Sequence, residues 1–472
     1  MSMSITSGHL AGIIVTLTGV TLVGLYAGRR VKSARDFQIG SRRASTAVVA
    51  GAIMGTLVGG SSTIGTAQMA FKYGLCAWWF TLGSGIGCAL LCLMARRVRE
   101  VPLHTVPQYL GFSFVKSTGL VACVVAFICS GLGVVAQGLS GVALLSAMFG
   151  ITSLAAAGLC VLLVLGFVIF GGVWGTGLVG VLKSSLLYLA VVGSGALAYY
   201  LAGGQAGLVA VFPSFPWFSF FGRSFNQDFA MGLSMLAGVL SSQYYIQAIY
   251  AGKSLADARR GALLSAVLVP PVGLGGVLVG LYMRANFPGI SPDQALPQFI
   301  LGHLPPFLAG VALAALLITV ICTWSGIVLG ISTILTRDIY KQYIRPGVGD
   351  SGMLLMQRLI ILLVCLLSVP LITTSAGTLI MGWVTLSMVL QSCATLLPLL
   401  AALYLPRLVT PAAATLSALL GPLAVAVWHL LFPDGLSPLY PGFLVSLLVI
   451  ILVSLVDRRG QDARGQLMDT TR

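Results

Sequence analysis

Runs of about twenty predominantly apolar residues recur along the whole chain, separated by short polar or basic stretches. An apolar helix of this length is what crosses the hydrocarbon core of a bilayer. Charged residues make up 8% of the 472-residue sequence and hydrophobic residues 58%, whereas a soluble domain carries about 25% charged residues. The sequence therefore predicts an all-α integral membrane protein with about 13 transmembrane helices.

The interpretation of the net charge of +15 depends on where the basic residues lie in the sequence. Lys and Arg residues lie in short clusters between apolar runs, such as Arg96, Arg97 and Arg99. They do not alternate with aromatic residues on one face, as in proteins that bind nucleic acid. We therefore exclude a nucleic-acid partner and assign the clusters to cytoplasmic loops. This predicts a multi-pass protein of the cell (plasma or inner) membrane with its N-terminus outside and a cytoplasmic tail at 458–472.

Residues that carry enzyme chemistry are dispersed. The four histidines are scattered, the nine cysteines contain no CxxC pair, and the eleven carboxylates lie in predicted loops or at predicted helix ends. An integral membrane enzyme needs a cluster of such groups. The sequence predicts that the protein is not an enzyme and has no cofactor, and that any cation site uses neutral oxygens.

Two predicted helices contain helix-breaking polar segments. Residues 45–70 include GAIMGTLVGGSSTIGTAQ (51–68), and residues 228–250 include Gly238, Ser241 and Ser242. Breaks of this kind free backbone carbonyls for a cation or solute, although close helix packing through small residues is an alternative interpretation.

Each break opens a group of about five predicted helices, at 45–201 and 228–403, which predicts an inverted repeat of the kind found in secondary transporters. We expect a single membrane domain over 1–472. One extra helix at 8–28 precedes the repeats, and two helices at 411–457 follow them.

One basic residue lies inside a predicted span. Lys183 is about one or two turns into a helix at 177–201. Its side chain either extends to the membrane interface or points into the bundle, as a proton carrier or a fixed positive charge at an ion site.

Several segments resemble those of the sodium/solute symporter family, whose members include proline, pantothenate, sugar and sialic-acid symporters. The similar segments are ARDFQIGSRR (34–43), STIGTAQMAFKYGL (62–75), AIYAGKSLADARRGA (248–262) and the stretch at 304–346 that ends in TRDIYKQYIRP. The resemblance covers nearly the whole chain. It implies the leucine-transporter-type five-plus-five fold and cation-coupled symport of a small organic solute by alternating access, with Na⁺ as coupling ion. We expect a functional monomer in the lipid bilayer.

The resemblance also implies residues for a sodium site: the carbonyls of Gly55, Val58 and Thr319 and the side chains of Cys322 and Thr323. Two features depart from the family. Cys322 stands where the family usually has serine, and a thiol is a poor ligand for Na⁺. The family often has Thr-Asp and, three residues further on, Gln at one place in the fifth core helix. This chain has Val179-Gly180 and Lys183 at the corresponding positions. An ammonium about 6 Å away, at an effective dielectric constant of about 20, repels Na⁺ by roughly 3 kcal/mol. Sodium-coupled symport and proton-coupled or uncoupled transport, with Lys183 in place of the ion, both stay open.

The expected solute contacts lie on three predicted helices. The resemblance implies Leu57, Gly59, Ser61, Ser62, Phe80, Thr81, Ser84, Gly238, Val239 and Ser242. Gln137 and Gln391 are added because they are polar residues within predicted spans. The aromatic gate residues of the sugar-type members are missing near Gly238, which favours a small organic solute other than a sugar.

Overall fold

The computed structural model describes residues 6–28, 43–100, 105–433 and 435–470, and almost all of them are helical. The helices of the first half are α1 (Ser7–Gly28), α3 (Thr46–Leu57), η2 (Ser61–Gly65), α4 (Thr66–Tyr73), η3 (Gly74–Trp78), α5 (Trp79–Glu100), α6 (Val106–Ser113), α7 (Lys116–Phe149), α8 (Ser153–Leu187), η4 (Tyr188–Val192), α9 (Gly193–Leu201), α10 (Gly204–Val211) and α11 (Ser214–Trp217).

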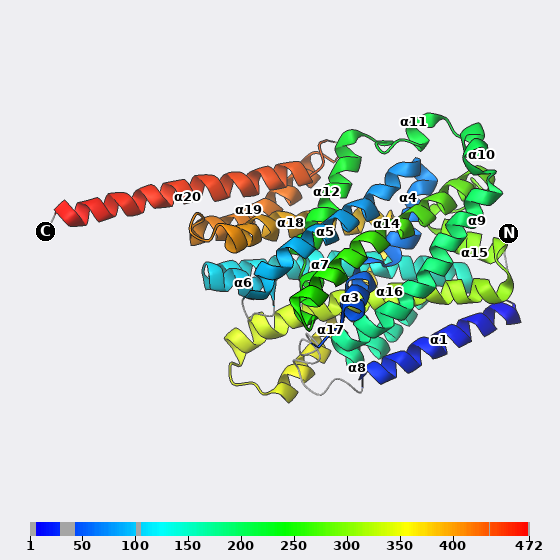
Figure 1. Ribbon diagram of the computed structural model, residues 1–472, viewed down its shortest axis with the longest axis horizontal. Helices are drawn as coiled ribbons and strands as arrows, with labels where there is room; N and C mark the ends of the chain where they lie inside the picture. Colours follow the sequence, from blue (N-terminus) through cyan, green and yellow to red (C-terminus); the bar gives the residue numbers. More distant parts are fainter. Residues whose placement is uncertain (1–5, 29–42, 101–104, 434, 471–472) are drawn as a thin grey trace.

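The second half continues the same architecture. Its helices are α12 (Phe225–Ser241), α13 (Gln243–Ala251), α14 (Leu255–Asn286), η5 (Pro292–Gln294), α15 (Ala295–His303), α16 (Pro306–Ile334), η6 (Leu335–Ile344), α17 (Asp350–Thr374), α18 (Ile380–Tyr404), α19 (Pro411–Leu431) and α20 (Leu439–Thr470). The long helices run side by side in one bundle, and α20 extends from one end of it (Figure 1).

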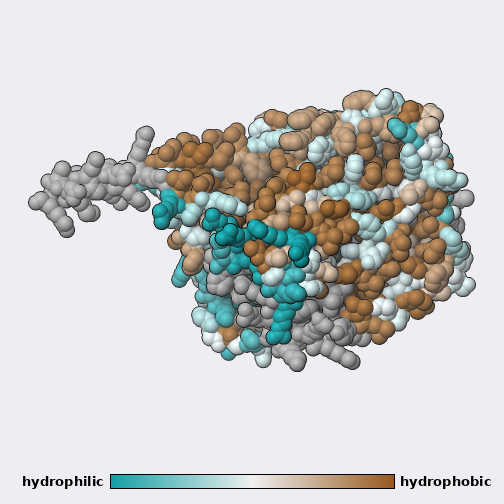
Figure 2. Space-filling model, viewed as in Figure 1, coloured by the Kyte–Doolittle hydropathy of each residue, from teal (hydrophilic) through white to brown (hydrophobic). Residues whose placement is uncertain are grey.

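The bundle has the surface of a membrane protein. Of the described residues, nine helical stretches are long and apolar enough to cross a membrane, and three shorter apolar helices accompany them. Hydrophobic side chains cover most of the visible face, and hydrophilic ones gather toward the end from which α20 extends (Figure 2). The prediction of an all-helical membrane protein is confirmed, whereas the count of 13 helices is not established.

Two expectations about helix boundaries need correction, and one falls outside the described chain. Helix α8 runs without interruption from Ser153 to Leu187, so no helix begins at residue 177, where we expected one. Helix α20 continues to Thr470, into the predicted tail at 458–472. Most of the segment ARDFQIGSRR lies outside the described residues.

Close approach between backbones determines how α8 packs on α3. A Cβ atom on Gly180 of α8 would lie 2.1 Å from the carbonyl oxygen of Gly51 on α3. Only glycine permits this separation, because real Cβ atoms do not approach backbone so closely. Gly180 therefore lets α8 pack directly on α3, one turn before Lys183.

Candidate cation and solute site

Helix α3 stops in the middle of the bundle. Its last residue is Leu57, and Val58 leaves helical geometry with φ −88° and ψ 89° before η2 begins at Ser61. Glycines are required at this break because a Cβ on Gly59 would lie 2.6 Å from Gln137 Oε1, and one on Gly60 would lie 2.2 Å from the Ser140 Cβ. The interruption frees the carbonyls that close the last turn of α3.

A second break separates α12 from α13. Ser242 is extended, with φ −83° and ψ 135°, and helical geometry resumes at Gln243. The side chain of Gln243 stabilises the break from the other side, since its Oε1 accepts a hydrogen bond of 2.8 Å from the Val106 backbone N–H. Both helices that the sequence marks as discontinuous are therefore interrupted at their polar segments.

Lys183 is fully buried and points into the bundle. Its Nζ lies 2.8 Å from the Gly55 carbonyl oxygen, 3.2 Å from the Thr319 carbonyl oxygen and 3.1 Å from Thr323 Oγ1. These acceptors come from the broken end of α3 and from α16. The alternative in which the side chain reaches the membrane interface is wrong in this structure.

The three acceptors match the three donors of a lysine ammonium group. Thr323 accepts from Lys183 and directs its own hydroxyl hydrogen toward the carbonyl of Gly55 at 3.0 Å or that of Val58 at 3.3 Å. In the described part of the chain, no carboxylate forms an ion pair with Lys183. The charge is thus held by neutral oxygens alone.

The structure brings together four of the five residues expected at the sodium site. Gly55, Thr319 and Thr323 surround the Lys183 ammonium, and the Val58 carbonyl is joined to them through the Thr323 hydroxyl. The fifth, Cys322, is buried in an apolar cluster with Val20, Val179 and Ile318, and it lies close enough to Lys183 for the two side chains to interact electrostatically.

The break in α3 is also held by Gln137 on α7. Its Oε1 accepts from the Gly60 backbone N–H at 2.9 Å, and its Nε2 lies 3.4 Å from Ser61 Oγ. Ser62 instead donates to the carbonyl of Leu57 at 2.9 Å, spanning the break. Gln137, Gly59, Ser61, Ser62 and Leu57 therefore form one polar region next to Lys183.

A second polar region surrounds the break after α12. Gln391 Nε2 lies 3.5 Å from the Ser241 carbonyl oxygen and 3.0 Å from Thr395 Oγ1. Ser242 and Gly238 both face Met388 of α18, the serine hydroxyl at 3.9 Å from its sulfur. Gln391, Gly238 and Ser242 thus lie together.

The expected contacts on α5 are placed differently. Thr81 faces α14, since a Cβ on Gly273 would lie 1.9 Å from Thr81 Oγ1. Ser84 is buried and donates to the carbonyl of Phe80 at 2.7 Å, within its own helix. Val239 packs on α5, where a Cβ on Gly87 would lie 2.9 Å from it. Thr81 and Val239 serve helix packing here.

Sequence reasoning missed residues beside the second break. Tyr244 and Tyr245 are buried and meet edge to face, with ring centroids 4.5 Å apart. The Tyr244 hydroxyl lies 4.0 Å from the Met388 sulfur. The aromatic pair directly after the polar break could have been recognised in the sequence as part of the site. Met388 could not, because methionine is an ordinary core residue.

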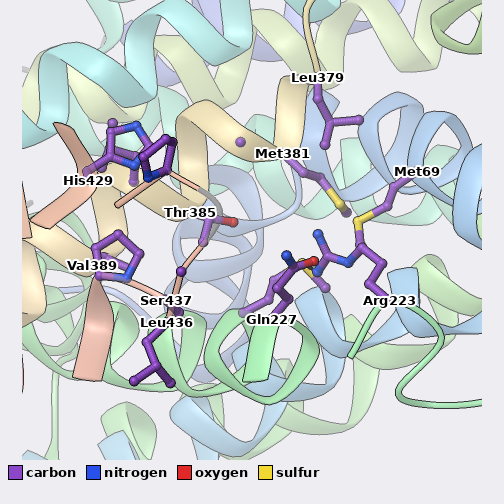
Figure 3. Close-up of a pocket in the computed structure, with 16 residues that line it drawn as sticks. Met69, Arg223, Gln227, Leu379, Met381, Thr385, Val389, His429, Leu436 and Ser437 are labelled. Atoms are coloured by element: carbon purple, nitrogen blue, oxygen red, sulfur yellow. Dashed lines mark hydrogen bonds between the residues drawn. The ribbon is translucent and has the colours of Figure 1, made fainter. Parts of the chain in front are cut away.

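A separate cavity of about 210 Å³ lies between α12, α18 and the connection from α19 to α20. Arg223, Gln227, Met69 and Met381 line it, and their side chains converge in Figure 3. Arg223 forms an ion pair with Asp228, Nε to Oδ1 2.6 Å, and the aspartate is fully buried. Nothing in the sequence indicates that this acid at a helix end is buried.

Broken helices around a buried polar centre, inside a bundle of apolar helices, are typical of secondary transporters. The chain belongs to the sodium:solute symporter family, which matches residues 37–421. Members of this family are transporters and not enzymes.

The relatives and structural neighbours agree with this assignment. The chain is 24% identical to the osmoregulated proline transporter OpuE of Bacillus subtilis, with 94% of each chain covered. It is 23% identical to the sodium/proline symporter of Escherichia coli, covering 97% of this chain and 94% of the relative. A Na⁺-coupled sialic acid symporter, determined in a substrate-bound outward-open state, has the same fold, with a TM-score of 0.80 at 18% identity over 96% of this chain and 98% of the other. The fold is therefore of the leucine-transporter type.

Proposed function

We propose that the protein transports a small organic solute by alternating access, and that the Lys183 ammonium takes the place of the sodium ion. The observation that carries this proposal is the set of three contacts from Nζ to Gly55, Thr319 and Thr323, at 2.8, 3.2 and 3.1 Å. Transport then depends on a proton carried by Lys183 or needs no coupling ion.

Electrostatic repulsion supports the replacement of Na⁺ by the Lys183 ammonium and argues against both cations occupying the position together. Two unit charges 4 Å apart repel by about 4 kcal/mol at an effective dielectric constant of 20, which weakens binding roughly a thousandfold. The carbonyls and hydroxyl that a Na⁺ ion needs are already engaged by Lys183. Na⁺ and the lysine ammonium therefore exclude each other from this position.

Sodium-coupled symport is the second candidate. Family membership favours it, as do relatives described as sodium/proline symporters. In that case Na⁺ binds only after Lys183 has moved away, or it binds at another position.

The polar regions at the two breaks support a solute without net charge. Gln137, Ser61, Gln391 and Ser242 supply hydroxyl and amide groups there, and Lys183 is held by its own acceptors. Backbone N–H groups at a helix break also suit a carboxylate. An amino acid such as proline, which is neutral overall, is the first solute to test.

Alternating access requires contacts that close each end of the bundle. At one end of α5, the Gln68 side chain of α4 bonds the Thr378 carbonyl at 3.2 Å and the Ile380 N–H at 3.0 Å. At the other end, Arg99 donates to the carbonyl of Ile249 at 2.7 Å.

We assign 45–201 and 228–403 to the two repeats that move relative to each other. We propose that the end of the bundle with the basic cluster Arg96, Arg97 and Arg99 faces the cytoplasm. We also propose that the protein works as a monomer in the cell membrane.

The test measures solute binding without sodium. Purified protein in choline chloride is melted with proline and a panel of other amino acids, and the stabilising solute is then used for uptake into liposomes. We expect stabilisation and uptake to persist in choline chloride. Binding and uptake that appear only with Na⁺ would support the second candidate and refute the first.

A further inference from the structure

A cavity of about 580 Å³ lies between α6, the beginning of α7, and η6, and its lining residues are different from those that form the breaks in α3 and α12. Helix α6 follows the basic end of α5 in the chain, so the cavity lies at the end of the bundle that carries Arg96 and Arg97. Its lining joins the first repeat, through α6 and α7, to the second, through η6.

Positive charge dominates this cavity. Lys116, Arg337 and Lys341 line it, together with the carboxylate of Asp338. Asp338 is buried, and its two oxygens lie 3.0 and 2.8 Å from the Thr105 hydroxyl, which donates to one of them. Within the described ranges, no carboxylate lies within ion-pair distance of Lys116 or Lys341. The cavity therefore presents a net positive charge to its surroundings.

Apolar side chains continue from this cavity along the membrane surface. Phe112 and Leu120 are among its lining residues, and their exposed fractions are 71% and 40%. Beyond Leu120, the exposed side chains of Val124, Phe127 and Ile128 follow on α7 at helical spacing. These positions share one face of the helix, which makes an apolar track that begins at the basic cavity.

We propose that this cavity binds the phosphate of an anionic phospholipid, with an acyl chain lying on the α7 track. Basic pockets at the ends of membrane helices attract lipid headgroups, because each Lys or Arg contributes favourable electrostatic energy near the surface. The adjoining apolar track favours a lipid over a soluble anion, because only a lipid has an acyl chain that can pack on the exposed side chains of Leu120, Val124 and Ile128. Lipid bound here contacts both repeats.

The test measures lipid binding directly, so its outcome does not depend on the coupling ion or the solute. Delipidated protein in detergent is titrated with phosphatidylglycerol and with phosphatidylcholine, and bound lipid is counted by native mass spectrometry. The double variant Lys116→Gln/Lys341→Gln removes two charges from the cavity. We expect about thirtyfold weaker phosphatidylglycerol binding, at roughly tenfold per 1.4 kcal/mol and about 1 kcal/mol for each charge.

The matched control, Lys253→Gln/Arg260→Gln, removes two exposed charges elsewhere and should leave binding within about twofold of the wild type. The conservative variant Lys341→Arg should retain binding, which separates charge loss from misfolding. Equal weakening in the control, no preference for phosphatidylglycerol over phosphatidylcholine, or equally tight binding of inorganic phosphate would each overturn the proposal.

Discussion

At the scale of single residues, the chemistry of the centre is decided by Lys183. Burial of an ammonium group is costly unless its donors are satisfied, and here each donor has an acceptor from a helix break or from α16. Each of these oxygens would lose one hydrogen bond if the side chain were removed, although the Thr323 hydroxyl would still donate to the Gly55 carbonyl. Lysine at this position is therefore both a structural link between α3, α8 and α16 and the charge of the site.

Lys183→Ala tests this dual role. The variant loses the hydrogen bonds from Nζ to three buried oxygens, and a hydrogen bond to a charged group contributes about 1.5–3 kcal/mol, so it should melt below the wild type in choline chloride. In NaCl it should recover, because the vacated oxygens can now bind Na⁺; an ion at 100 times its dissociation constant adds about 2.7 kcal/mol.

The comparison is thermal melting of both proteins in the two salts at equal ionic strength. Ser185→Ala, an exposed position on the same helix, serves as the control and should behave as the wild type. A Lys183→Ala variant that melts like the wild type in both salts would show that the three contacts of Nζ do not contribute to thermal stability.

Gln137 gives a second residue-scale prediction. Gln137→Leu leaves the Gly60 N–H of the α3 break without its acceptor, which should cost about 1–3 kcal/mol of stability and weaken solute binding. Melting in denaturing detergent and the solute-dependent shift of the melting temperature are the two readouts. Unchanged solute affinity would remove Gln137 from the site.

At the scale of helices, the breaks in α3 and α12 and the packing of α8 define the centre. The breaks were predictable because glycine and hydroxyl residues within an apolar segment weaken helical geometry locally. The direction of Lys183 was not, since it depends on how α8 rotates against α3 and α16, and that rotation follows from close contacts such as Gly180 with Gly51. Sequence alone does not contain that tertiary information.

Gly180→Ala should displace α8 from α3. The added Cβ would meet the Gly51 carbonyl at 2.1 Å, and overpacking of this kind costs roughly 1–3 kcal/mol. Gly166 lies on the same helix with open space around it, so Gly166→Ala is the matched control and should not destabilise the protein. Melting temperatures of the two variants provide the measurement, and equal effects would contradict the packing argument.

At the scale of the whole molecule, the sequence predicted the helical bundle, because apolar length and charge distribution are global properties. The transporter class followed from the two broken helices and from the family resemblance. It did not predict the burial of Asp228 and Asp338, or the position of Thr81 against α14. Each of these depends on which side of its helix faces a neighbour. Site residues were therefore less predictable than the fold that holds them.

Orientation in the membrane is a prediction at this scale. Gly289 and Gly347 are exposed with open space around them, and the charge distribution places them outside and inside the cell, respectively. In intact cells, a membrane-impermeant maleimide should label Gly289→Cys and not Gly347→Cys. The nine native cysteines are buried, which keeps background labelling low. The reverse pattern would invert the proposed orientation.

The most direct test of the central claim is the melting temperature of the wild-type protein in NaCl and in choline chloride at equal ionic strength. Because Lys183 already occupies the oxygens of the cation position, we predict the same melting temperature in both salts. A saturable rise specific to NaCl would mean that Na⁺ binds the folded wild-type protein. That result would contradict the replacement of sodium by Lys183.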